Sequence, residues 1–186
     1  ALTREMHLDG FIDPGHVSAI IGSDIWGTMD IPLPQVISGF KPDQLLHAIL
    51  LLLQLIQKKE VKVVNDYPEV VFPDGNRVAQ QLIKETLKPV DADWRGMGTI
   101  PLSGLAPIDE SLDARILYKD LFQTIVSVEN PQCRCGEIVR GLAEPRQCPL
   151  FGTVCTPQTP QGACMVSESE GACAIAYKYG KSLSEV

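Results

Sequence analysis

The distribution of cysteine constrains this chain more than any other feature of its sequence. No cysteine occurs before residue 133, and six follow up to residue 173: Cys133, Cys135, Cys148, Cys155, Cys164 and Cys173. A disulfide scaffold would bridge the whole chain, and inert buried cysteines would be spread through its core. Thiolates are soft ligands for zinc, copper and iron–sulfur clusters. The pattern therefore predicts a thiolate-ligated metal centre in a C-terminal module.

Composition and charge limit the partners. The chain has 186 residues, 45% hydrophobic and 21% charged, which suits one globular domain or a domain with a small module. Its net charge of −7 disfavours a nucleic-acid partner, which would need a basic surface. The apolar run Leu45–Ile56 is shorter than the ~20 residues of a bilayer span, so we expect no membrane partner. Residues 1–5 lack the apolar core of a signal peptide, so we expect a cytoplasmic protein, where clustered cysteines favour metal or redox chemistry.

Strand and helix patterns alternate over the first 105 residues. Apolar runs bounded by turn residues predict four strands, at 8–12, 35–40, 61–65 and 97–101. The segment 16–22 is predicted to be a helix or a turn, and helices are predicted at 42–59 and 78–88. This alternation predicts an α/β fold over residues 1–125, with an open, mainly parallel sheet flanked by helices.

The remainder of the chain reads differently. Residues 106–130 are predicted to be helical and connective. From Asn130 onward Pro, Gly and Cys dominate and hydrophobic periodicity disappears. Such a segment needs something other than a hydrophobic core to order it, and metal binding can supply that free energy. We therefore predict a second, loop-rich module over residues 126–186.

Three kinds of thiol site remain open on spacing. Structural zinc sites usually use two C-x2–4-C knuckles. Here the one close pair is Cys133-x-Cys135, and the gaps after Cys148 are six to eight residues. A purely structural disulfide set disagrees with a reducing compartment. The ligands of an iron–sulfur cluster can come from widely spaced loop positions, and six cysteines would leave two as a redox pair. The spacing favours an iron–sulfur cluster, with a zinc-stabilised interaction module as the alternative.

A series of short motifs occurs in order along the chain: Pro14-Gly15-His16-Val17-Ser18, Gly39-Phe40-Lys41-Pro42, Asp93-Trp94-Arg95-Gly96, Cys133-Arg134-Cys135-Gly136, Cys148-Pro149-Leu150-Phe151-Gly152, Cys155-Thr156-Pro157, Gly162-Ala163-Cys164-Met165-Val166-Ser167 and Glu170-Gly171-Ala172-Cys173. Together these motifs closely resemble the HypD family of hydrogenase maturation proteins. The resemblance spans nearly the entire chain and is most specific in the cysteine module.

The resemblance implies a function in metallocentre assembly. The family builds the Fe(CN)2CO unit of [NiFe]-hydrogenases together with a HypC-type scaffold chaperone. Cyanide comes from a HypE-type donor that works with HypF. Family members carry two similar α/β domains and a module with a [4Fe–4S] cluster that resembles the cluster of ferredoxin–thioredoxin reductase. The resemblance therefore implies a redox-active maturation scaffold, rather than a conventional turnover enzyme, that acts on a transient iron carrying CN and CO ligands.

The resemblance also implies roles for individual residues. Four cysteines become ligands of the [4Fe–4S] cluster: Cys133, Cys148, Cys155 and Cys173. Cys135 and Cys164 become a redox-active thiol/disulfide pair beside it. His16 follows the first predicted strand, and ligands of open α/β sheets bind at the carboxyl ends of strands. A lone histidine is more often structural, but the Pro-Gly-His setting and the resemblance together assign His16 to the iron-binding cleft.

Two departures from the family pattern bear on these expectations. Lys41 stands where the family pattern has an acidic residue, and Glu69 stands where it has a basic one. The N-terminal half of the family, with a further cysteine motif, has no counterpart here, so we expect this α/β domain to belong to a fragment or a processed product. The missing half keeps a second function open, namely an iron–sulfur disulfide reductase that resembles ferredoxin–thioredoxin reductase.

Overall fold

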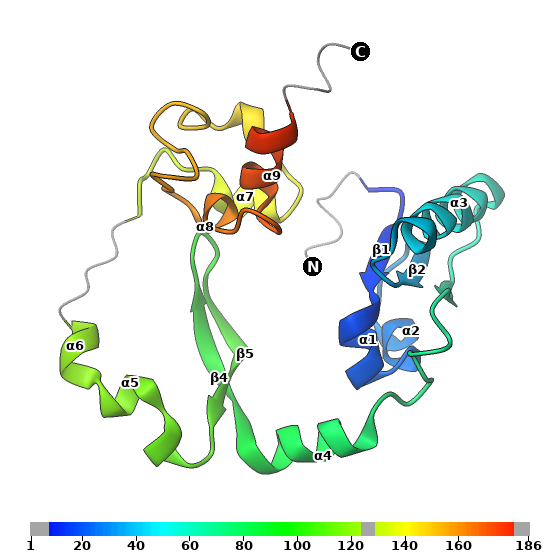
Figure 1. The fold of residues 1–186 in the computed structure, drawn as a ribbon, viewed down its shortest axis with the longest axis horizontal. Helices are drawn as coiled ribbons and strands as arrows, with labels where there is room; N and C mark the ends of the chain where they lie inside the picture. Colours follow the sequence, from blue (N-terminus) through cyan, green and yellow to red (C-terminus); the bar gives the residue numbers. More distant parts are fainter. Residues whose placement is uncertain (1–7, 124–128, 181–186) are drawn as a thin grey trace. The chain divides into compact units, whose positions relative to one another are not determined.

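The computed structural model describes residues 8–123 and 129–180 (Figure 1). These residues form two compact units, which divide between Thr86 and Leu87. The first unit contains the parallel sheet, and the second contains an antiparallel hairpin and the cysteine-rich region. That residues 1–125 and 126–186 fold as two separate domains, as expected from the sequence, stays a prediction.

The first unit is built on three parallel strands. β1 (Phe11–Pro14), β2 (Gln35–Ser38) and β3 (Val63–Asn65) lie in that order in the sheet. Ile12 pairs with Val36, and Val36 pairs with Val64. All four residues of β2 are buried, as expected for the middle strand of a parallel sheet. The α/β class and the parallel arrangement of these three strands are confirmed.

Helices follow the strands as the sequence predicts. They are α1 (Gly15–Ile21), α2 (Asp24–Thr28), α3 (Pro42–Lys58) and α4 (Arg77–Thr86). α3 packs on the sheet through Ala48 and Leu55, which share a core cluster with Val36. It begins with Pro42, where a missing N–H has no helical partner to lose, and ends at Lys59 in the left-handed conformation. Within the described ranges, no helix combines the length and apolar character that crossing a membrane requires.

The chain after α4 corrects one sequence expectation. The segment 97–101 was expected to close the parallel sheet, but it lies within β5 (Gly98–Pro107), which pairs antiparallel with β4 (Leu87–Trp94). This long hairpin is separate from the three-stranded sheet. Gly96 and Gly98 have φ values of 79° and 72°, so the two glycines allow the backbone to reverse at this point. The reversal explains why the strand is antiparallel.

The hairpin leads into short helices. These are η2 (Glu110–Leu112), α5 (Ala114–Leu117) and α6 (Lys119–Gln123), which confirm the helical, connective character expected for this region up to residue 123. The part of that expectation at residues 124–128 falls outside the described residues. The cysteine-rich region then contains only brief elements: α7 (Cys135–Val139), η3 (Pro145–Gln147), α8 (Ala163–Val166) and α9 (Ala172–Tyr179). Its loop-rich character is confirmed.

Candidate metal centre and sheet-edge site

The six cysteines come together in one core. Five of them are buried in a single cluster with apolar side chains that include Ile138, Leu150 and Met165. The sixth, Cys133, is half-buried and packs against the same cluster. All six are free thiols. Thiols spread over some forty residues of sequence are thus gathered by a module with little regular secondary structure.

Short elements place each thiol. Cys135 is the first residue of α7, and Cys148 directly follows η3. Cys155 closes a tight turn, in which its N–H donates to the carbonyl oxygen of Leu150. Cys164 lies in α8 and Cys173 in α9, and these two helices pack together. The cysteines therefore approach one core from four elements and a turn.

The Cys164 thiol makes the closest contacts in this core. Its Sγ lies 3.1 Å from the Sγ of Cys173, to which it donates a hydrogen bond. The Cys164 thiol also interacts with the thiol of Cys135, and each affects the pKa of the other. The backbone N–H of Cys164 donates to the Cys135 Sγ at 3.3 Å. Cys164 therefore contacts both its expected redox partner and one expected cluster ligand.

Backbone groups around the thiols are close and directed at sulfur. The N–H of Gln161 donates to the Cys155 Sγ at 3.3 Å. Next along the chain, a side chain on Gly162 would approach the Cys133 Sγ within 2.8 Å and the Cys135 Cβ within 2.7 Å. Only glycine lets the backbone pass this close to two cysteines. Hydrogen bonds to sulfur of this kind tune the potential of thiolate-bound iron.

The surroundings of three of these thiols, those of Cys133, Cys135 and Cys164, favour their protonated form. Burial raises the pKa of both Cys133 and Cys135. The hydrogen bond with Cys173, followed by burial, raises the pKa of Cys164. Because metals bind thiolates, any metal taken up here must displace protons.

The donor set fits an iron–sulfur cluster. Cysteine thiolates are the usual ligands of [4Fe–4S] clusters, and four expected ligands face one core here. Within the part of the chain that the structure describes, no three His, Cys, Asp or Glu side chains converge closely enough to hold a single ion. The thiolates of a cluster bind different iron atoms and need no such convergence. We therefore take the cysteine core to fit a cluster.

The turn of the β4–β5 hairpin lies against this core. Arg95 donates a hydrogen bond of 2.8 Å to the carbonyl oxygen of Gln161, and the N–H of Gly96 donates to Glu129 at 2.9 Å. Gly96 also packs on Gly136 so closely that a Cβ at Gly136 would overlap the Gly96 carbonyl oxygen. A cavity of about 20 Å³, which has room for one water molecule, lies between the turn residues Arg95 and Gly96 and the thiols of Cys133 and Cys135.

Sequence reasoning assigned no role to this turn. The available signal was the motif Asp93-Trp94-Arg95-Gly96, an arginine beside a glycine in a hairpin turn. The structure explains the motif as the segment that covers the side of the core where Cys133 and Cys135 lie.

His16 belongs to the other compact unit. It is the second residue of α1, directly after β1, which confirms the expected position at the carboxyl end of a strand. Its exposed ring packs on Phe40, with ring centroids 5.1 Å apart. Gly15 beside it is required by close packing, since a Cβ there would lie 2.5 Å from the Ser38 carbonyl oxygen and 2.7 Å from the Tyr67 ring. The role of His16 stays a prediction.

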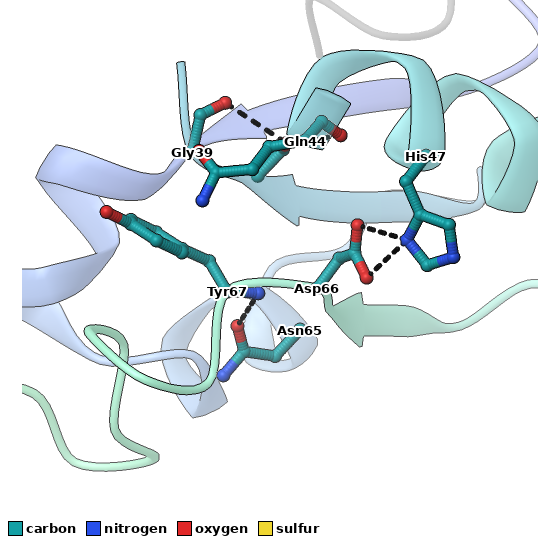
Figure 2. Close-up of polar contacts among 7 residues, drawn as sticks. Gly39, Gln44, His47, Asn65, Asp66 and Tyr67 are labelled. Atoms are coloured by element: carbon teal, nitrogen blue, oxygen red, sulfur yellow. Dashed lines mark hydrogen bonds and ion pairs between the residues drawn. The ribbon is translucent and has the colours of Figure 1, made fainter. Parts of the chain in front are cut away.

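Polar side chains from α3 and from the loop after β3 meet at the same edge (Figure 2). The Nδ1 of His47 lies 2.9 and 2.8 Å from the two carboxylate oxygens of Asp66. The Oδ1 of Asn65 accepts from the Tyr67 N–H at 3.1 Å. Gln44 accepts from the Lys41 N–H at 3.2 Å. These contacts fix the loops that surround the carboxyl ends of β2 and β3.

Asp13 is a site residue that sequence reasoning missed. It lies on β1, three residues before His16, and its Oδ2 has no hydrogen-bond partner among the described residues. Asp13 is 6% exposed, and burial raises the pKa of its carboxyl to about 6. The Oε1 of Gln35, on the same face of the sheet, also lacks a partner there. Nothing in the local sequence separates this aspartate from a surface one.

The two departures from the family pattern are both exposed. Lys41 is the N-cap residue of α3, and Glu69 lies in the turn after Tyr67. The ion pairs between described residues do not include one that joins Lys41 to Glu69. In the part of the chain that the structure describes, Lys41 and Glu69 therefore do not compensate each other through an ion pair.

The family model for HypD, described as the hydrogenase formation hypA family, matches residues 1–180. The chain is 42% identical over 183 residues to the hydrogenase maturation factor HypD of Escherichia coli K12, which covers 96% of this chain and 48% of that protein. It is 41% identical over 181 residues to the hydrogenase maturation factor HypD2 of Bradyrhizobium diazoefficiens, covering 95% and 47%.

A third relative is archaeal. A putative hydrogenase expression/formation protein of Methanocaldococcus jannaschii is 39% identical over 180 residues, covering 96% of this chain and 50% of that protein. The chain thus spans about half the length of the curated relatives that it matches. The family model that matches residues 1–180 and these relatives lead to one conclusion, which is that the chain belongs to the HypD family of hydrogenase maturation proteins.

Proposed function

We propose that this chain carries the [4Fe–4S] module of a hydrogenase maturation factor and serves as a redox-active scaffold in assembly of the Fe(CN)2CO unit of [NiFe]-hydrogenase. The observation that carries the proposal is the gathering of six free thiols into one core of a HypD-family chain. The proposal covers the part of the process in which thiols and a cluster exchange electrons with a scaffolded iron.

Four thiolates would hold the cluster, from Cys133, Cys148, Cys155 and Cys173. When bound, the cluster would supply single electrons to groups beside it. Cys135 and Cys164 do the two-electron work, because oxidation of two thiols to a disulfide releases two electrons and two protons. The hydrogen bonds between these two residues support the pairing. The Gly162 backbone keeps Cys133 and Cys135 close together without a side chain between them.

The substrate is iron carrying CN and CO ligands, delivered on a HypC-type chaperone, with cyanide from a HypE-type donor. His16 is our candidate for contact with this substrate, because it is exposed at the carboxyl edge of a parallel sheet. We assign the work to the cytoplasm, where thiols stay reduced until they are used.

Anaerobic reconstitution tests the proposal directly. The reduced chain, incubated with iron and sulfide and then desalted, should retain about four iron atoms, the number in the proposed cluster, and show the visible absorption of a cluster. A HypC-type chaperone should co-purify with the reconstituted chain. Zinc at one ion per chain with no cluster absorption would establish the zinc-stabilised module instead.

An iron–sulfur disulfide reductase is the second candidate. The observation behind it is that all six thiols lie in one module, with no cysteine in the preceding 132 residues to hold an iron substrate. Turnover of a small disulfide substrate by the reconstituted, reduced chain would favour this candidate. A stable complex with the chaperone and no such turnover would favour the maturation scaffold.

A further inference from the structure

We propose that Cys164 can form a disulfide with either of two cysteines, and that the presence or absence of a bound cluster determines which one. In the cluster-free chain Cys164 pairs with Cys173, and in the cluster-bound chain it pairs with Cys135. The inference deepens the proposed function, because it rests on Cys173 being a cluster ligand. It gives the module a redox-controlled step that comes before cluster assembly.

The geometry of Cys164 is the starting point. Its Sγ lies 3.1 Å from the Cys173 Sγ, and its backbone N–H donates to the Cys135 Sγ at 3.3 Å. A divalent sulfur can form one disulfide at a time. The two possible bonds have opposite consequences, since a bond to Cys135 leaves all four expected ligands free, whereas a bond to Cys173 removes one of them.

The backbone holds Cys164 and Cys173 together. They lie on α8 and α9, which pack against each other. Between the helices, a side chain on Gly171 would come within 2.5 Å of the Cys164 carbonyl oxygen, so a glycine is needed for the close approach. Both thiols are buried, at 6% and 3% exposure. The approach is thus a property of the packed module.

The chemistry is ordinary thiol–disulfide exchange. With oxidised glutathione as the oxidant, the Cys164 and Cys173 thiolates each displace one molecule of glutathione. The net reaction converts two thiols and one glutathione disulfide into one protein disulfide and two reduced glutathiones. The protein loses two electrons and two protons, and glutathione gains them.

Cys135 can then release Cys173 from the Cys164–Cys173 disulfide without an external reductant. Its thiolate attacks the Cys164 sulfur, forms the Cys135–Cys164 bond and displaces Cys173 as a thiolate. No electrons are gained or lost in this exchange. The released Cys173 thiolate then binds iron and is no longer free to attack the new disulfide. Cluster assembly therefore shifts the exchange equilibrium towards the Cys135–Cys164 disulfide.

Digestion after glutamate can read the pairing directly. It places the thiols on three peptides, namely 130–137 with Cys133 and Cys135, 138–168 with Cys148, Cys155 and Cys164 (the Glu144–Pro145 bond resists cleavage), and 171–185 with Cys173. The full 186-residue chain, reduced and free of metal, is exposed to oxidised glutathione without oxygen and alkylated at intervals. A link between 138–168 and 171–185 should form first, about ten-fold above a link between 130–137 and 138–168.

Variants remove the ambiguity within the middle peptide. A Cys148→Ser, Cys155→Ser double variant leaves Cys164 as the one thiol of peptide 138–168 and should keep the same link. Cys173→Ser should move the link to 130–137. Predominance of the 130–137 link in the cluster-free double variant, or in the cluster-free unsubstituted chain, would overturn the proposal.

The second half of the proposal is tested by iron uptake. Oxidised unsubstituted chain, given iron and a limiting amount of sulfide without a thiol reductant, should assemble the cluster. Oxidised Cys135→Ser should take up iron at least ten-fold more slowly and should recover with dithiothreitol. Equal uptake by both oxidised proteins would overturn the exchange step. If even the fully reduced unsubstituted chain binds no iron, the proposed function fails, whereas the peptide map still decides which partner Cys164 takes.

Discussion

The guanidinium of Arg95 donates a hydrogen bond to the carbonyl oxygen of Gln161 at 2.8 Å, which ties the turn of the β4–β5 hairpin to the loop before α8. Next to this bond, Gly96 packs on Gly136 at the start of α7. The hairpin turn therefore covers the side of the core where Cys133 and Cys135 lie. Any change that lifts the turn should expose these two thiols to solvent.

Gly136→Ala is the sharpest way to lift the turn. The added Cβ would overlap the Gly96 carbonyl oxygen, so the hairpin must move. We expect alkylation of Cys133 and Cys135 in the metal-free chain to become about ten-fold faster, which corresponds to about 1.4 kcal/mol of lost docking free energy. Mass spectrometry of peptide 130–137 measures this. Gly27→Ala is the control, since a Cβ there meets nothing within 4 Å. Unchanged alkylation in Gly136→Ala would show that the turn does not shield the thiols.

The six thiols should divide into two classes on substitution. Cys148→Ser should lose or degrade the reconstituted cluster and loosen residues 131–179, because the module has too little apolar periodicity to hold itself together. Cys133→Ser, Cys155→Ser and Cys173→Ser should behave alike. Cys135→Ser and Cys164→Ser should keep the cluster absorption but lose redox function. Visible absorbance at equal protein concentration separates the classes. Equal loss of colour in all six variants, or colour retained in Cys148→Ser, would contradict the ligand assignment.

The parallel sheet could be predicted from the sequence because its signals are local. Val36 and Ile37 form a continuous apolar run, and the long helix after them begins with a proline. The hairpin could not be predicted in this way. Pro89, Asp91 and Asp93 hide the pattern of β4, whose pairing partner follows a glycine-rich turn. A strand of this kind is specified by cross-strand pairing, which no single segment displays.

The candidate site, too, could be predicted from the sequence only in part. The cysteines are visible as residue types at a spacing, so a thiol core could be predicted. The contact between Cys164 and Cys173 could not be predicted, because a gap of eight residues does not set the distance between two sulfurs. Asp13 was missed because its burial and unpartnered oxygen are properties of the packed sheet. The residues that carry chemistry are thus read from the sequence, but their mutual contacts come from packing.

Ser18 should contribute to the stability of the first compact unit. It is fully buried, its hydroxyl donates to the Pro14 carbonyl oxygen at 2.9 Å, and the hydroxyl oxygen accepts from the Trp26 Nε1 at 3.0 Å. Ser18→Ala removes both hydrogen bonds and should lower the free energy of unfolding by about 1–2 kcal/mol. Urea denaturation followed by Trp26 fluorescence, in a Trp94→Phe background, measures the change. Thr28→Ala, which removes an exposed hydrogen bond, should cost less than about 0.5 kcal/mol. An equal loss in both variants would contradict the role of burial.

Asp13 should make the stability of the same unit depend on pH. Burial raises the pKa of its carboxyl from 3.8 to about 6, so the folded state holds this proton more tightly than the unfolded state does. The contribution of the Asp13 carboxyl to the free energy of unfolding is therefore fully present below about pH 3.8 and is lost as the pH rises through about 6.

The corresponding substitution is Asp13→Asn, which cannot ionise. Above pH 6 it should be more stable than the unsubstituted chain by about 1–2 kcal/mol, a range that allows for partial access of water to the carboxyl. Below pH 4 the two proteins should be equally stable. Urea denaturation from pH 3.5 to 8, again followed by Trp26 fluorescence in the Trp94→Phe background, tests this. Because other carboxylates titrate over the same range, the difference between the two proteins is the quantity to compare. A difference that does not change with pH would show that burial does not raise the pKa of the Asp13 carboxyl in the folded state.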